Sequence, residues 1–125
     1  MDMAAAIALG VIGLLAVFQV ALACGAPLGH FAWGGKSRVL PAKLRIGSIA
    51  AIATYGIFAV FVLSKTGWAV VIENQLVLQI GLWAITAYLA LMIVANAASR
   101  SKYERYTMTP IAAVLAICFL VVAIG

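Results

Sequence analysis

Four long apolar runs divide the sequence, and none of them alternates apolar with polar residues. They cover residues 3–23, 46–63, 75–98 and 110–125. A bilayer core about 30 Å thick needs about 20 helical residues, and the first three runs have about that length. A membrane strand would alternate over about 10 residues and would require a closed barrel. A continuous run satisfies its own backbone hydrogen bonds in lipid only as a helix, so the pattern predicts four membrane-spanning helices.

The residues at the ends of the runs predict where each helix begins. Asp2 and Asn74 stand before the first and third runs as N-cap residues. Pro41 is expected to start the second helix, and Thr109 with Pro110 the fourth, because proline suits the first helical position. We expect helices over about 3–23, 42–64, 75–98 and 110–125 in a single domain, 1–125.

Composition gives the same answer as the pattern. The chain has 125 residues, of which 67% are hydrophobic and 9% are charged. Soluble domains usually contain about 25% charged residues, and a small domain has too much surface to hide so many apolar side chains from water. No Lys or Arg precedes Lys36, so a cleaved signal, which begins with basic residues, is not expected. The sequence therefore predicts an all-α integral membrane four-helix bundle.

The charges are distributed unevenly between the two sides of the membrane. The net charge is +5, and seven of the eight basic residues fall in the first and third connections. By the positive-inside rule these connections are cytoplasmic and both termini face outward. We therefore expect the basic residues to contact anionic lipid headgroups at the cytoplasmic face, and we expect no nucleic-acid partner because too few charges could touch phosphates.

The first connection, residues 24–40, has an unusual composition for a solvated linker. It contains four glycines, a proline and two aromatic residues between positions 25 and 35. Glycine disfavours a stable helix there, and the segment is too apolar to extend freely into water. Two interpretations stay open: this glycine-rich loop either folds back against the inner ends of the helices, or lies as a plain interfacial loop.

Two segments carry a resemblance to a known family. The first is Gly25-Ala-Pro-Leu-Gly29 with Ala32-Trp-Gly-Gly35, followed by Val39-Leu-Pro41 and Leu44-Arg45. The second is Asn96-Ala-Ala-Ser-Arg-Ser-Lys-Tyr-Glu-Arg105 with Thr109-Pro110. Together they resemble a family of small bacterial four-helix membrane proteins whose activity is uncharacterised. The resemblance implies a bacterial inner membrane and no particular reaction.

Two sets of polar residues are candidates for a functional site. One set is expected at the inner face: His30, Trp33, Arg38, Arg45, Asn96, Arg100, Glu104 and Arg105. Its four arginines suggest a site for a headgroup phosphate. Arg100 and Glu104 would meet on one helix face if the third helix continued past Ser99. The second set lies within the runs: Gln19, Tyr55 and Gln79. These residues would form either a polar pathway or interhelical hydrogen bonds, which contribute about 0.6 kcal/mol each in membranes.

Catalytic and metal chemistry find little support in the residue types. His30 is the only histidine, and Cys24 is the nearest metal-binding side chain, so the three or four ligands of a metal site are missing. No cofactor-binding motif is present, and none of the runs has an ionisable group at its centre, which disfavours a proton-coupled exporter. Acid–base catalysis by His30 and Glu104 together stays open as an alternative.

Three function classes follow from these observations. The first is a scaffold that associates with itself or with a larger membrane complex, since small residues let helices approach closely. The small residues considered for such contacts are Gly10, Gly13, Gly47, Ala51 and Gly56. The second is an oligomeric channel or transporter for a small solute or ion. The third is a membrane enzyme acting on a lipid-linked substrate.

Overall fold

The computed structural model describes all 125 residues and contains helices but no strand. Its helices are α1 (Asp2–Ala23), η1 (Gly29–Phe31), η2 (Trp33–Gly35), α2 (Ala42–Thr66), α3 (Gln75–Ala97) and α4 (Lys102–Ile124). The two η elements are single 3₁₀ turns inside the glycine-rich loop. Each α-helix is long and apolar enough to cross a membrane. The predicted fold class, four membrane-spanning helices, is confirmed.

The start of the fourth helix differs from the prediction. α4 begins at Lys102, about two turns before the expected start at residue 110, and Pro110 lies inside it. Ser101 is its N-cap, and the Ser101 hydroxyl accepts a hydrogen bond from the Glu104 backbone N–H at 3.4 Å. An internal proline removes one helical hydrogen bond, a loss that membrane helices tolerate through neighbouring groups. The apolar run therefore marked the lipid-facing part of α4 and not its beginning.

The other helix ends are close to those expected. Asn74 caps α3, and its side-chain oxygen accepts from the N–H groups of Leu76 and Val77 at 3.0 and 3.2 Å. Asp2 is the first helical residue of α1, so it is not the cap; Met1 occupies that position. An acidic residue in the first turn still interacts favourably with the helix dipole.

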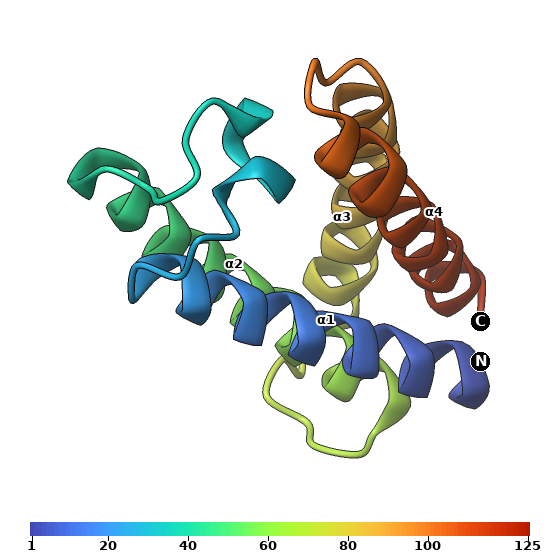
Figure 1. Ribbon diagram of the computed structural model, residues 1–125. Helices are drawn as coiled ribbons and strands as arrows, with labels where there is room; N and C mark the ends of the chain where they lie inside the picture. Colours follow the sequence, from blue (N-terminus) through green and yellow to red (C-terminus); the bar gives the residue numbers. More distant parts are fainter.

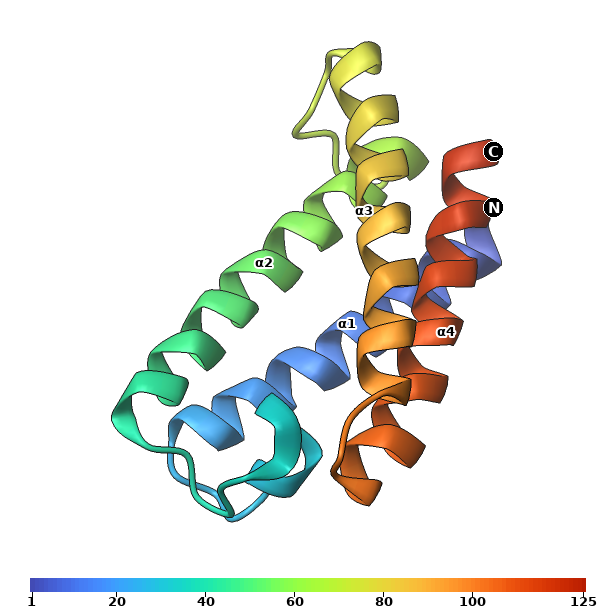
Figure 2. The same cartoon turned by 90° about the horizontal axis from the view of Figure 1, so that it is seen from above.

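The four helices form two hairpins that diverge from one end of the molecule. α1 packs against α2, and α3 packs along α4 (Figure 1). Both chain termini and residues 67–74 lie at the end where the hairpins meet, which we call the terminal end. The glycine-rich loop and residues 98–101 lie at the other end, which we call the basic end. Figure 2 shows α2 and α3 separating from the 67–74 connection toward the basic end.

The hydrophobic core joins the hairpins at the terminal end. Phe58 of α2 stands at its centre, with ring centroids 5.8 Å from Phe119 and 5.9 Å from Tyr88. The Phe119 side chain has no exposed surface. The core is the following set: Ala5, Ala8, Ile12, Phe58, Val62, Leu78, Leu82, Ile85, Leu89, Leu115, Ala116, Cys118, Phe119, Val122 and Ala123. Because these residues come from all four helices, the terminal end is closed.

Glycine contributes to helix contacts at a different position from those expected. A Cβ atom on Gly81 would lie 2.0 Å from the Phe61 ring, so this glycine lets α2 and α3 meet near the terminal end. Gly10, Gly13 and Gly56 have no atom within 4 Å of such a Cβ and lie on exposed faces. They make no contacts within the bundle because these faces of α1 and α2 point outward, and their role in contacts with a second copy or another membrane protein stays a prediction.

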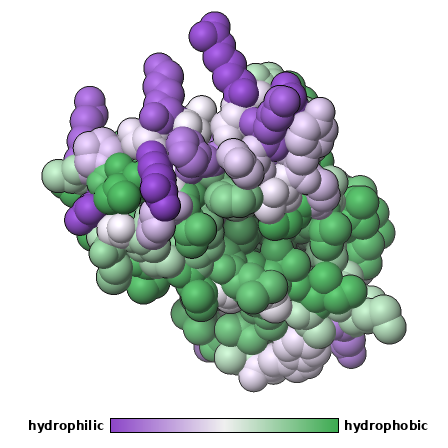
Figure 3. All heavy atoms as spheres, viewed as in Figure 1, coloured by the Kyte–Doolittle hydropathy of each residue, from purple (hydrophilic) through white to green (hydrophobic).

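The outward faces of the helices are apolar, as lipid contact requires. Leu14, Ile46 and Leu91 are among the large side chains that are more than half exposed. Figure 3 shows hydrophilic residues gathered over the basic end and a broad hydrophobic surface below them. In water such a surface would drive aggregation, whereas in a bilayer it is the expected boundary with the hydrocarbon.

Replacing Phe119 with alanine tests whether the core at the terminal end holds the hairpins together. Removing a fully buried phenylalanine leaves a cavity and costs about 3–5 kcal/mol in well-packed cores. We expect Phe119→Ala to lower the melting temperature of the purified protein in detergent, measured by circular dichroism. Ile117→Ala is the matched control on the same helix, since Ile117 is 62% exposed. Equal melting temperatures for the two variants would contradict this packing.

Candidate ligand-binding cavity

A cavity of about 490 Å³ lies between the two hairpins, in the half of the molecule nearer the basic end. Its α2 lining lies within residues 47–55 and its α3 lining within residues 88–96, which are the segments next to the basic connections. Most of its lining is apolar. The cavity exists because the hairpins diverge there, while the core fills the space between them at the terminal end.

The cavity is open between α2 and α3 and closed by α1 and α4. Gln19, Ala112 and Leu115 line it from α1 and α4, and all three are buried. Tyr88 on α3 and Trp33 in the glycine-rich loop also line it, but they are 48% and 42% exposed. The exposed side of the cavity therefore lies between α2, α3 and the loop, where the neighbouring helix surface is apolar and faces lipid.

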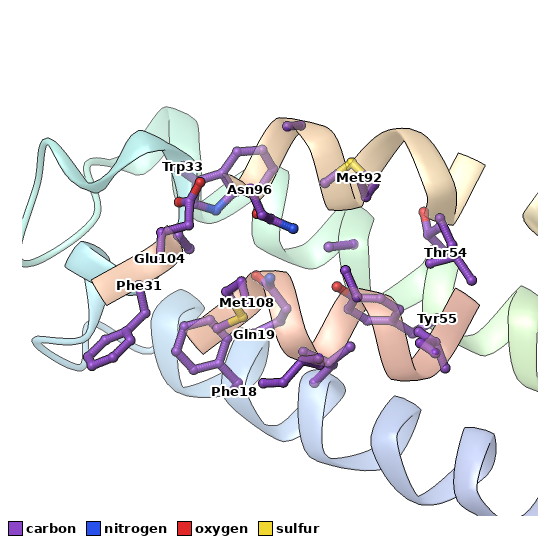
Figure 4. Close-up of a pocket in the computed structure, with 18 of the residues that line it drawn as sticks. Phe18, Gln19, Phe31, Trp33, Thr54, Tyr55, Met92, Asn96, Glu104 and Met108 are labelled. Carbon is purple, nitrogen blue, oxygen red and sulfur yellow. The ribbon is translucent and has the colours of Figure 1, made fainter. Parts of the chain in front are cut away.

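The one charged group that lines the cavity lies at its basic end. Figure 4 shows Glu104, Asn96 and Trp33 grouped at one end, with Thr54 and Tyr55 at the other. Glu104 is 8% exposed and is the only charged residue among the buried residues of the chain. A mostly apolar space with a few convergent polar groups is the usual form of a ligand-binding site.

Glu104 connects the two hairpins through its carboxylate. Its Oε2 accepts a hydrogen bond of 3.0 Å from the backbone N–H of Gly34 in the glycine-rich loop. A glutamate three residues after a serine N-cap commonly bonds back to the N–H of that serine. Here the Ser101 N–H instead donates to the Ser99 hydroxyl at 3.2 Å. The Glu104 side chain is thus free to hold the loop, and no ion pair neutralises it.

The glycine-rich loop folds against the first turn of α4, so the first of the two interpretations of its sequence is correct. The Ser101 hydroxyl donates to the carbonyl oxygen of His30. A Cβ on Gly35 would lie 2.3 Å from the Ser101 Cβ, and one on Gly29 would lie 1.9 Å from the carbonyl oxygen of Ser37. Both positions need glycine because the backbone approaches too closely for any side chain.

Trp33 forms the part of the loop that covers the cavity. Its φ of +53° is unusual for a bulky residue. The indole Nε1–H donates to the Ser48 hydroxyl on α2 at 3.3 Å, and the ring lies against Gly47. The loop therefore contacts α2 through Trp33 and α4 through Gly34, and spans the gap between the hairpins.

Gln19 is a buried amide with an unsatisfied oxygen. The residue is 7% exposed, lines the cavity from α1, and its Oε1 has no hydrogen-bond partner. Figure 4 shows its side chain directed from α1 into the space between the helices. A buried amide oxygen without a partner costs about 1–3 kcal/mol, so a bound molecule that donates a hydrogen bond would stabilise this region.

The cavity brings together only part of the predicted inner-face site. Trp33, Asn96 and Glu104 line it, whereas the other five predicted residues do not. The His30 Nδ1–H donates to the Gly35 carbonyl oxygen at 3.0 Å, and the ring packs near Tyr103. His30 is therefore a structural residue of the loop and does not share the cavity with Glu104.

The four arginines of the predicted phosphate site are held separately. The Arg45 Nε–H donates to the Leu40 carbonyl oxygen at 2.8 Å. The Arg105 guanidinium lies 4.9 Å from the centroid of the Tyr106 ring. Arg38 and Arg100 are exposed. α3 ends at Ala97, so the expected helical pair of Arg100 with Glu104 does not form. The headgroup-phosphate site stays a prediction.

The predicted intramembrane polar residues divide in the same way. Gln19 and Tyr55 line the cavity. Gln79 lies at the terminal end, where its Oε1 accepts from Lys65 Nζ at 3.1 Å and its Nε2 donates to the Ala123 carbonyl oxygen at 2.6 Å. Gln79 is therefore an interhelical bridge, and the core separates it from the cavity. No continuous polar pathway links the two ends of the bundle.

Met92 and Met108 also line the cavity, and sequence reasoning did not select them. Their flexible thioether side chains can adapt to differently shaped apolar ligands. Nothing in the sequence distinguishes them from methionines of an ordinary core. Ser101 was also missed, although the Ser-x-x-Glu spacing of Ser101 and Glu104 is a recognised helix-start pattern.

Comparison with known proteins leaves the resemblance to the bacterial four-helix family untested. The chain matches no family model, no curated protein and no solved structure. The case for a function therefore depends on the cavity and its polar groups.

The alanine variant of Gly29 tests whether the loop must dock for the cavity to be covered. The added methyl group would overlap the Ser37 carbonyl oxygen and displace the loop backbone. By hydrogen–deuterium exchange in nanodiscs, we expect amides of residues 29–38 to exchange at least about tenfold faster, with residues 75–97 unchanged. Gly10→Ala, where a methyl group meets no neighbour, serves as the control. Loop exchange identical to that of the unmodified chain would show that docking does not depend on this close approach.

Proposed function

We propose that this protein is a membrane carrier for a small amphipathic solute, which binds between the two hairpins. The observation that carries the proposal is the asymmetry of the bundle. A cavity of about 490 Å³ is open in the half nearer the basic end, while packed side chains close the terminal half. A carrier alternates between states with the site open to one side and then to the other. An open channel would instead need a continuous path, which the core interrupts.

The proposed location is the bacterial inner membrane, with the basic end in the cytoplasm and both termini outside. Seven basic residues at one end of the molecule, in the connections and the adjoining first turns of α2 and α4, support this orientation. The exposed Lys36, Arg38 and Arg100 are suited to contact anionic headgroups there. In this orientation the cavity opens toward the inner leaflet.

A scaffold role is the second candidate, supported by one surface. Gly10 and Gly13 leave an exposed, small-residue face on α1 with no neighbour. Such faces allow the helix of a second copy or of another membrane protein to approach closely. This role does not use the cavity. An enzyme acting on lipid-linked substrates has less support, because His30 lies outside the cavity that holds Glu104.

A phenylalanine in place of Ala51 tests the carrier proposal by filling the cavity. Ala51 lines the cavity from α2. The liposomes are loaded with two aromatic solutes that lipid excludes, a quaternary ammonium and a sulfonate. We expect the unmodified protein to transport at least one of these two solutes. Ala51→Phe should reduce that flux by at least about tenfold, because the ligand and the new ring compete for the same volume.

Ala53→Phe is the matched control, since Ala53 is exposed two residues away and does not line the cavity. Its flux should equal that of the unmodified protein. Liposomes that stay sealed to both solutes would contradict the carrier proposal and favour the scaffold. If both phenylalanine variants lose flux equally, transport does not depend on this cavity.

A further inference from the structure

We propose that the ligand of the cavity is a monovalent organic cation with an apolar body, whose charge is held by Glu104. The inference rests on the proposed function only in that the cavity receives a ligand, and it adds the chemical class of that ligand. Three observations support it: a buried carboxylate without a counter-ion, the aromatic residues that line the same cavity, and the absence of an ion pair between Glu104 and any basic side chain of the protein.

The Glu104 carboxylate is incompletely satisfied by the protein. One oxygen accepts from the Gly34 N–H, and the other has no hydrogen-bond donor. The N-terminus of α4 provides a partial positive charge, a contribution of about 0.3–1 kcal/mol in most cases. Because Glu104 is 8% exposed, its carboxylate loses much of its hydration, which is unfavourable for a charged group. A cation in the cavity would supply the missing opposite charge at the free oxygen.

The basic side chains of the same region are directed elsewhere. Arg45 bonds the Leu40 carbonyl oxygen, and Arg105 lies over Tyr106. His30 donates to the Gly35 carbonyl oxygen. None of them makes an ion pair with Glu104, so the protein does not neutralise its own buried acid.

The lining suits an organic cation better than a metal ion or an anion. Trp33, Tyr55 and Tyr88 line the cavity, and aromatic faces attract cations by about 0.5–2 kcal/mol. The chain contains no group of three metal-binding side chains. An anion would meet the Glu104 carboxylate directly. The volume of about 490 Å³ lies in the range of sites for drug-sized molecules.

The polar amides and the opening complete the description of the ligand. Gln19 and Asn96 line the cavity near Glu104 and can bond an amine or hydroxyl group of the ligand. The opening between α2 and α3 lies beside apolar helix surface, so a ligand with an apolar body can enter the cavity there. A protonated amine on an apolar body fits these conditions, whether it is a free molecule or the amine headgroup of a lipid.

Binding in nanodiscs tests the inference without requiring transport. Three probes share one apolar body and differ in charge at pH 7: 1-naphthylmethylamine is cationic, 1-naphthylmethanol is neutral and 1-naphthylacetate is anionic. Affinities are measured by equilibrium dialysis against phosphatidylcholine nanodiscs, with empty nanodiscs subtracted. We expect the amine to bind at least about tenfold more tightly than the alcohol, and the acetate to bind most weakly.

The variant Glu104→Gln removes the charge and keeps an oxygen that can accept from Gly34. It should abolish the preference for the amine and leave the affinity for the alcohol unchanged. Glu73→Gln is the matched control, because Glu73 is exposed in the 67–74 connection and far from the cavity lining. It should bind all three probes as the unmodified protein does. Hydrogen exchange of the loop would confirm that Glu104→Gln keeps the docked fold.

A second set of nanodiscs distinguishes the two sources of the amine. If the headgroup of phosphatidylethanolamine occupies the cavity, that lipid should weaken amine binding in the unmodified protein and not in Glu104→Gln. Equal binding in both lipids assigns the cavity to a free cation. Both results support the inference.

The inference would be overturned if no probe binds saturably, if the alcohol or acetate binds more tightly than the amine, or if the preference survives in Glu104→Gln. Its failure is distinguishable from failure of the carrier proposal. If binding is charge-selective but the liposomes stay sealed, the carrier proposal is refuted and the inference about the cation stands. If the protein transports the sulfonate and this flux does not depend on Glu104, the inference about the cation is refuted and the carrier proposal stands.

Discussion

The contact between the glycine-rich loop and the first turn of α4 is the constraint on which the cavity depends. The hairpins are packed together at the terminal end, and α2 and α3 diverge toward the basic end. The loop spans this gap, bound to α4 through Gly34 and His30 and to α2 through Trp33. Without this bridge the hairpins could close on each other or separate further, and the space between them would have no fixed shape.

The same contact explains why a carboxylate is buried in an apolar region. Glu104 gives up the usual bond to its own N-cap and holds the loop instead. This arrangement places one oxygen against the loop and leaves the other without a hydrogen-bond donor from the protein. A structural bond and a site for a positive charge thus come from a single side chain. The two roles can be separated, because a neutral amide keeps the bond and loses the charge.

The sequence predicted the helices well, because membrane spans are set by local apolar length. It missed the start of α4, since the first two turns of that helix, residues 102–109, lie outside the apolar run. The cavity could not be predicted, because it depends on the angle between two hairpins and not on any one segment. For the same reason the sequence did not show that Gly81, and not Gly10 or Gly56, lets two helices of the bundle approach closely. The unusual composition of the loop left docking as one of two open interpretations, and it did not indicate to which helix the loop docks.

The separation of the hairpins at the basic end tests the central claim most directly. Spin labels at positions 43 and 100, both exposed, would report this separation by double electron–electron resonance in nanodiscs, with the free Cys24 and Cys118 replaced. We expect a single narrow distance distribution that broadens when Ser101→Ala and Glu104→Ala together remove the contacts with the loop. A distribution that the two substitutions leave unchanged would contradict the claim that the loop holds the cavity open.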